Sequence, residues 1–189
     1  MVSGEFACWD AAQRIAPRAI ENVRWYAAYT RARHEKSVAR QLESRLIDAF
    51  LPLYVRLSQW KDRRVSVQSP LFPGYVFVRI PLLERMRVLE IPGVVRLVGF
   101  TDQPTPLPEE EMEALRQGLR TGLLAEPYPY LEVGRRVRLR SGPLQGLEGI
   151  LKKKKTTFRF VISMELIQRS ISVEVDAADL EPHPSRSCS

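Results

Sequence analysis

Cysteine and histidine are scarce in this sequence, which has 189 residues but only two of each. Cys8 and Cys188 lie near opposite ends of the chain, and the histidines are His34 and His183. Four zinc ligands could be gathered only by bringing both ends together, and neither cysteine has a metal-binding or disulfide spacing. We therefore expect no metal, no cofactor and no disulfide framework.

Catalytic motifs and long apolar runs are missing as well. No serine or cysteine stands in a recognisable nucleophile setting, no pair of acids stands out, and no phosphate-binding G-x-x-x-x-G-K loop occurs. No apolar run approaches the roughly 20 residues that span a bilayer. The N-terminus lacks the basic and apolar segments of a secretory signal. The sequence predicts a cytoplasmic protein that is not an enzyme and does not bind a membrane.

Positive charge, in contrast, is in excess, with a formal net charge of +7 at pH 7. It is concentrated in three stretches: Arg31, Arg33, Lys36, Arg40 and Arg45; Lys61, Arg63 and Arg64; and residues 135–159, which carry nine basic residues and one acid, Glu148. A basic balance favours a polyanion such as nucleic acid as partner, although the same charge also keeps a protein soluble.

Residues 25–121 combine strand and helix patterns, after a flexible tail predicted at 1–24. Strands are predicted at 25–30, 50–57, 65–67, 75–80 and 94–98, and helices after His34, at 82–89 and from Pro108. In the first helix Val38, Leu42 and Leu46 recur every four residues, which predicts one apolar stripe. The order predicts an α+β domain with helices over one face of a mainly antiparallel sheet.

Residues 122–130 contain two prolines and no period, which predicts a semi-rigid linker between two domains. From 131 to 181 the pattern is all β, with strands near 133–140, 150–151, 158–164 and 171–175. Several short strands in so few residues predict a small β-barrel. Residues 182–189 are predicted to be disordered.

The turn before the strand at 75–80 carries apolar residues on a stiff backbone. Pro70 and Pro73 fix their φ angles, and Leu71 and Phe72 lie between them, with Tyr75 close behind. One interpretation is a turn that caps a core strand. The other is an apolar pocket offered to a partner, since rigid aromatic residues make good binding anchors.

The start of the first helix is basic, with Arg31, Arg33, His34 and Lys36 close together. Cations oppose the helix dipole at this end, which favours an anion docking there. A solvated helix face is the alternative interpretation.

Two sets of motifs resemble one family. The segment 137–150, with Gly142, Gly146 and Gly149, resembles the KOW motif of ribosomal proteins and NusG-type transcription factors. The blocks Trp25-Tyr26, 33–39, 71–78 and 91–94 resemble the NusG N-terminal domain, so the resemblance covers residues 25–181. The segment 70–75 and the helix start at 34–36 look most similar to the specialised antiterminators of the RfaH and polysaccharide-operon types. The fold it implies is α+β, a NusG N-terminal α/β sandwich followed by an SH3-like KOW barrel.

The resemblance also implies a function and its sites. A NusG-type factor binds RNA polymerase, suppresses pausing, contacts the non-template DNA strand, and recruits a small-subunit ribosomal protein or Rho; we expect a monomer. Matching positions for polymerase binding are Leu71, Phe72, Pro73 and Tyr75. Those for nucleic acid are Arg31, Arg33, His34 and Lys36, with Arg63 and Arg64. Those for the partner of the barrel are Leu144, Leu147, Leu166, Ile167 and Arg169.

The alternative hypothesis is a ribosome-associated RNA-binding protein with a KOW barrel. Such a protein would not need the Leu71–Tyr75 block or the α+β domain before the barrel. These two features separate the hypotheses.

Overall fold

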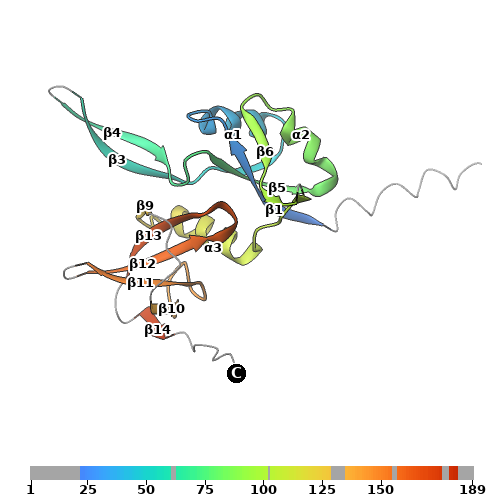
Figure 1. The fold of residues 1–189 in the computed structure, drawn as a ribbon. Coiled ribbons are helices and arrows are strands. Elements are labelled where there is room, and N and C mark those ends of the chain that lie inside the picture. Colours follow the sequence, from blue (N-terminus) through green and yellow to red (C-terminus); the bar gives the residue numbers. More distant parts are fainter. Residues whose placement is uncertain are drawn as a thin grey trace, which may run out of the picture.

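The N-terminal half is built on a four-stranded antiparallel sheet in the order β2-β5-β1-β6. The structure, a computed structural model, describes residues 22–60, 63–101, 103–128, 135–154, 157–175 and 179–182. The predicted tails lie almost wholly outside these ranges. The sheet's strands are β1 (Val23–Thr30), β2 (Asp48–Phe50), β5 (Tyr75–Pro81) and β6 (Val94–Leu97) (Figure 1).

Helices cover both faces of this sheet, which corrects the expectation of helices on one face. Helices α1 (Glu35–Ser44) and α2 (Arg85–Leu89), the latter preceded by the 3-10 turn η1 (Leu82–Glu84), pack on one side. Helix α3 (Glu109–Arg120) packs on the other. Strand alternation explains this, because Tyr26 and Ala28 face α1 whereas Trp25 and Ala27 face the side of α3. The result is the predicted α/β sandwich.

The predicted strand 50–57 is interrupted, and its second part leaves the sheet. After β2 the chain passes Leu51 and Pro52, then forms a separate hairpin of β3 (Leu53–Trp60) and β4 (Arg63–Pro70). Pro52 has no N–H for a strand partner, while its carbonyl accepts a bond from Leu71 N–H at 2.9 Å. The hairpin extends away from the sheet (Figure 1). A short pair, β7 (Gly99–Phe100) and β8 (Gln103–Pro104), follows β6.

The apolar stripe of α1 ends earlier than predicted. Val38 and Leu42 are fully buried, but Leu46 is 93% exposed. The helix stops at Ser44, and Leu46 adopts a left-handed φ of 58°. Ile47 N–H then reaches Leu42 O at 3.0 Å, and Leu46 N–H reaches Glu43 O at 3.0 Å, which is the Schellman pattern. Ile47 is buried instead of Leu46.

The C-terminal half forms the predicted barrel-like domain. Six antiparallel strands follow the order β14-β10-β11-β12-β13-β9. They are β9 (Ala125–Tyr128), β10 (Arg135–Leu139), β11 (Glu148–Lys154), β12 (Thr157–Met164), β13 (Arg169–Val175) and β14 (Leu180–Pro182), with the 3-10 turn η2 (Glu165–Ile167) before β13. Position 149 on β11 requires a glycine, since a Cβ at this position would lie 2.6 Å from Phe160 Cζ and from Val161 O.

Strand β9 lies inside the range predicted as linker. It pairs with β13 from Val173↔Ala125 to Ser170↔Tyr128. Arg159 on β12 adds an ion pair with Glu126 on β9 at 3.2 Å. The connection between the two halves is therefore shorter than 122–130, with residues 121–124 between α3 and β9.

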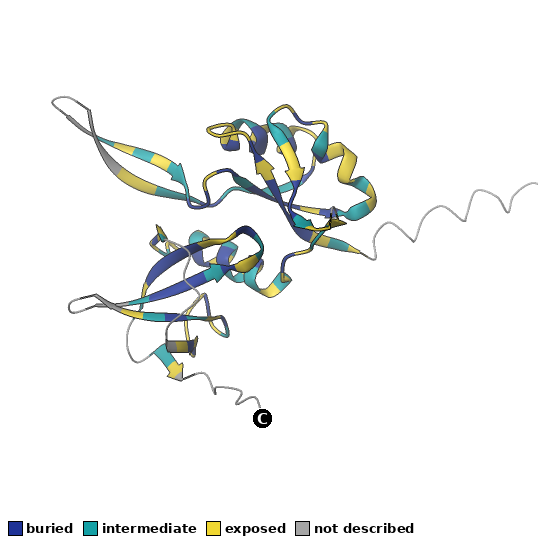
Figure 2. Ribbon diagram, viewed as in Figure 1, coloured by how far each residue is buried: buried dark blue, intermediate teal, exposed yellow. Residues whose placement is uncertain are grey.

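The two halves share one apolar cluster. It joins Trp25, Phe77 and Leu115 of the first half with barrel residues such as Leu144 and Phe160. At the contact, a Cβ on Gly118 of α3 would lie 3.2 Å from Leu144 Cδ2. Figure 2 shows buried positions along the strands of both sheets. No helix within the described ranges is long and apolar enough to cross a membrane.

Candidate functional site

Three predicted motifs meet at one end of the N-terminal sheet, where β1 runs into α1. Thr30 N–H donates to Gly74 O, and Arg31 N–H donates to Gly93 O, both at 2.8 Å. The first bond brings in the turn at 71–74, and the second brings in the turn before β6. Motifs that are far apart in sequence therefore form one surface.

Glu35 fixes this arrangement from inside. Its side chain is buried, and its Oε1 accepts a hydrogen bond from Gly74 N–H at 2.8 Å. A buried carboxylate is tolerated when a donor satisfies it, and a hydrogen bond to a charged group is stronger than a neutral one. Glu35 therefore links the start of α1 to the apolar turn.

Gly93 closes the same junction, because no side chain fits at its position. Its φ is +103°, and a Cβ there would lie 3.0 Å from Val38 and 3.2 Å from His34 Cβ. The close approach brings the turn at 91–93 directly against the first turn of α1. The motif residues Glu35, Gly74 and Gly93 therefore serve to join the three loops.

The predicted nucleic-acid residues Arg31, Arg33 and His34 are all exposed in the β1–α1 loop. Arg33 has a left-handed φ of 65°, which is uncommon for a residue with a side chain and is found at functional sites. His34 Nδ1 lies 3.0 Å from Ala32 O, which holds the ring in one orientation. The loop thus presents two guanidinium groups and an imidazole to solvent.

The other predicted cations lie elsewhere. Lys36 Nζ donates to Gln68 O at 2.9 Å, at the base of the β3–β4 hairpin. Arg63 and Arg64 pair with Trp60 and Gln59 at the far end of that hairpin, and their side chains lie outside the described residues. The structure therefore brings together Arg31, Arg33 and His34, but not the whole predicted set.

The turn at 71–75 supplies both core and surface residues. Leu71 and Phe72 are 1% exposed, and Phe72 packs edge-on against Phe77 with ring centroids 5.5 Å apart. Leu71 and Phe72 therefore pack in the core, as in the interpretation that this turn caps a core strand. Pro73 is exposed and Tyr75 is half-buried.

An aromatic pair that the sequence analysis missed completes the surface. The rings of Tyr29 and Tyr75 lie 5.5 Å apart, and the Arg96 guanidinium lies 5.9 Å from the Tyr29 ring centroid. Tyr29 is 39% exposed. In the sequence, Tyr29 was visible only as an aromatic residue near the end of a predicted strand. The pairing Tyr29↔Tyr75 between β1 and β5 places it beside the apolar turn.

In the barrel, the predicted partner-binding residues are mostly covered. Leu144, Leu147 and Ile167 are buried, and Leu166 is half-buried. Leu144 packs toward Gly118 on α3. Arg169 is exposed at the start of β13. In this arrangement the first barrel loop faces the N-terminal half.

Within the described ranges, no three His, Cys, Asp or Glu side chains gather in a way that could hold a metal ion. An acidic group does occur between the two halves, where Glu111 of α3 faces Glu148 and Glu165 of the barrel across a cavity of about 870 Å³. The pKa of Glu111 is raised, first because burial disfavours its charged form, and then because Glu165 and Glu148 are negative neighbours.

Proteins of known family resemble this chain over most of its length. A family model described as transcription termination factor NusG matches residues 23–116. The transcription termination/antitermination protein NusG of Neisseria meningitidis serogroup B is 26% identical, covering 84% of this chain and 97% of its own. The protein of the same name from Staphylococcus aureus is 30% identical, covering 84% of this chain and 94% of its own. The chain belongs to the NusG family.

As a NusG-family protein the chain is a transcription factor, which confirms the NusG resemblance inferred from the sequence blocks. The closer similarity to the RfaH and polysaccharide-operon types stays a prediction. A solved structure described as the domain interaction in Thermotoga maritima NusG has a TM-score of 0.54 and 21% identity, covering 85% of this chain and 97% of that one. This likeness concerns the fold and confirms the α+β class with its C-terminal β domain.

Proposed function

We propose that this NusG-family protein binds RNA polymerase and the non-template DNA strand through one end of its N-terminal sheet, and thereby suppresses pausing. The observation that carries the proposal is the hydrogen bond between Gly74 N–H and Glu35, which joins the apolar turn to the basic loop. Polymerase-binding and DNA-binding motifs then present one continuous face, as an adaptor between two partners requires.

On this face, exposed Pro73 and half-buried Tyr75 are the anchors, with Tyr29 beside them. Leu71 and Phe72 hold the turn from beneath, since both are buried. Arg31 and Arg33 are placed to contact phosphates, and His34 is placed to stack on an exposed base. We propose that Lys36, Arg63 and Arg64 also contact phosphates of the DNA, at a greater distance from this face.

The barrel supplies the second half of the proposed function. We propose that 25–121 and 131–181 act as two domains, with β9 belonging to the barrel, and that Leu144, Leu147, Leu166, Ile167 and Arg169 bind a small-subunit ribosomal protein or Rho. Because Leu144 is buried toward α3, partner binding requires the barrel to leave the N-terminal domain.

An elongation assay on a reconstituted polymerase complex tests the proposal. Tyr75→Ala should weaken binding by about tenfold or more, because truncating an interface anchor costs at least about 1–2 kcal/mol. Phe100→Ala is the matched control, since Phe100 is exposed elsewhere. Arg31→Ala with Arg33→Ala should lower affinity and reduce its salt dependence by about one unit of slope per lost phosphate contact. Parent-like binding and pause suppression by both variants would refute the proposal.

A further inference from the structure

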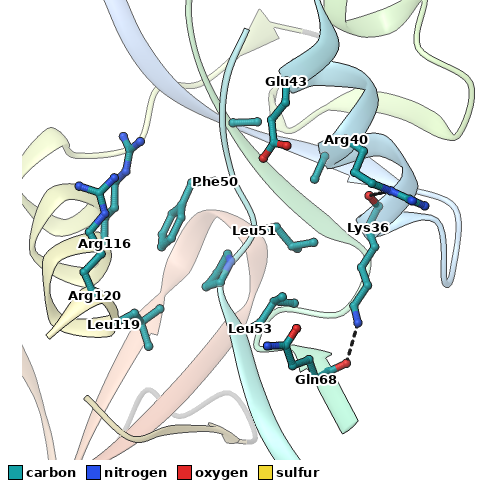
Figure 3. Close-up of a pocket in the computed structure, with 13 residues that line it drawn as sticks. Lys36, Arg40, Glu43, Phe50, Leu51, Leu53, Gln68, Arg116, Leu119 and Arg120 are labelled. Carbon is teal, nitrogen blue, oxygen red and sulfur yellow. Dashed lines mark hydrogen bonds between the residues drawn. The ribbon is translucent and has the colours of Figure 1, made fainter. Parts of the chain in front are cut away.

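A groove runs along β2, the edge strand of the N-terminal sheet at the opposite edge from β6. It has a volume of about 810 Å³ and lies between α1 and α3 (Figure 3). Its floor is apolar, formed mainly by half-buried Phe50, Leu51, Leu53 and Leu119. An apolar concave surface with polar groups around it is the usual form of a binding groove.

The rim of the groove is basic on both sides. Figure 3 shows Lys36 and Arg40 on α1 at one side of the apolar floor, and Arg116 and Arg120 on α3 at the other side. Glu43 is the acidic residue among those lining it. The groove therefore carries an excess of positive charge that its own lining does not neutralise.

The four cations differ in how they are already used. Arg116 binds Asp48 with N–O distances of 3.1 and 3.3 Å and stacks over Trp25, and Lys36 donates to Gln68 O. Arg40 Nε donates to Lys36 O at 3.4 Å, a single long hydrogen bond to the backbone. Neither Arg40 nor Arg120, on opposite rims, has a carboxylate within ion-pair distance among the described residues. These two exposed guanidinium groups are available to a ligand from outside.

The floor decides which kind of anion fits. A nucleic-acid strand would use the cations but gains most from exposed aromatic faces on which bases stack. Here Phe50 packs instead against Trp25 and Phe77, at ring-centroid distances of 6.4 and 6.3 Å. The remaining floor side chains are aliphatic. Leucines flanked by arginines match a ligand that carries apolar side chains together with carboxylates.

We propose that this groove binds an acidic amphipathic segment of a partner protein. Its apolar side chains lie between Leu51, Leu53 and Leu119, and its carboxylates pair with Arg40 on one rim and Arg120 on the other. The site goes beyond the function proposed above, because neither Arg40 nor Arg120 belongs to the proposed face for polymerase and DNA at the end of the N-terminal sheet. It also adjoins the docking contact of the barrel, since Leu119 follows Gly118 directly.

A binding titration with the full-length protein tests this inference. The probe is a labelled synthetic helical peptide with leucines on one face and glutamates on the other, and the same residues in scrambled order form the control peptide. Saturable binding of the first peptide is expected, with amide shifts centred on Leu51, Leu53 and Leu119. Arg40→Glu with Arg120→Glu should weaken binding by about tenfold or more, as expected when two favourable ion pairs become repulsive.

Arg24→Glu with Arg85→Glu is the matched control variant, because both arginines are exposed outside the groove and the net charge change is the same. It should bind within about twofold of the parent. Equal losses in the two variants, equal binding of the scrambled peptide, or no saturation would each overturn the proposal. So would displacement of the peptide from these residues by a single-stranded oligonucleotide at lower concentration, which would identify a nucleic-acid groove instead.

Discussion

At the scale of single residues, the structure explains why the family motifs contain the residues that they do. Glu35 is acidic within a basic stretch because it is buried and accepts the Gly74 N–H. Gly93 is a glycine because a side chain would meet Val38 and His34. These residues shape the proposed binding face without being its contacts.

Glu35→Ala should destabilise the N-terminal domain by about 1–3 kcal/mol, because it leaves the buried Gly74 N–H without an acceptor. Thermal or denaturant unfolding measures the effect, and Glu35→Gln should lose less because an amide oxygen can still accept. Glu43→Ala, an exposed position on the same helix, is the control. An unfolding free energy of Glu35→Ala equal to that of the control would show that this hydrogen bond does not stabilise the junction.

Leu46→Gly should stabilise the protein by roughly 0.5–1 kcal/mol, since glycine adopts the left-handed conformation without the steric cost of a Cβ. Leu46 is 93% exposed, so its side chain contributes little packing. Leu46→Ala, which keeps the Cβ, should be close to the parent. A lower denaturant midpoint for the glycine variant would contradict the left-handed cap at this position.

At the scale of elements, the sequence predicted most strands and helices because apolar alternation follows their burial. β1, β5, β12 and β13 are examples. It missed β9, since Ala-Glu-Pro-Tyr has a proline and no alternation, and only the pairing with β13 makes it a strand. It placed Leu46 in the core because periodicity does not show where a helix ends.

The candidate site was predictable to a similar degree. The basic loop and the apolar turn are visible as motifs, whereas their contact through Glu35 and Gly74 is tertiary and leaves no local signal. Tyr29 was missed for the same reason, since its partner Tyr75 lies across the strand pair β1–β5. Lys36 looked like part of the basic loop because sequence spacing does not show that its amine reaches Gln68 O.

A barrel fragment that includes β9 should be more stable than one that begins after it. The pairing with β13 and the Arg159–Glu126 ion pair at 3.2 Å exist only when β9 is present. We expect residues 124–184 to show a β-type circular dichroism spectrum and a higher unfolding midpoint than residues 129–184. Equal unfolding midpoints of the two fragments would indicate that β9 is a linker and does not stabilise the barrel. A helical spectrum would contradict the barrel fold.

At the scale of the whole molecule, docking of the barrel on α3 brings three carboxylates together. Burial and the nearby Glu165 and Glu148 raise the pKa of Glu111, and Arg136 lines the same cavity. The docked protein therefore takes up a proton more readily than the unfolded chain. The stability contributed in this way is complete below the ordinary glutamate pKa and is lost as the pH rises through the raised value.

Glu111→Gln should remove this pH dependence. The variant should be more stable than the parent at neutral pH, and the difference should shrink as the pH falls toward the ordinary glutamate pKa. Unfolding free energies measured across this range test it, with Glu110→Gln, an exposed neighbour on α3, as control. A difference between variant and parent that does not change with pH would contradict the acidic contact between the two halves.

If one end of the N-terminal sheet faces both polymerase and DNA, site-specific crosslinking in a reconstituted elongation complex should detect both contacts. A photoreactive residue is placed in turn at Tyr75, at Arg33, and at Arg24, which is exposed at the opposite end of β1. We expect crosslinks from position 75 to polymerase and from position 33 to the non-template strand, with neither from position 24. Crosslinks from position 24 alone, or from none of the three in a complex that retains the protein, would contradict it.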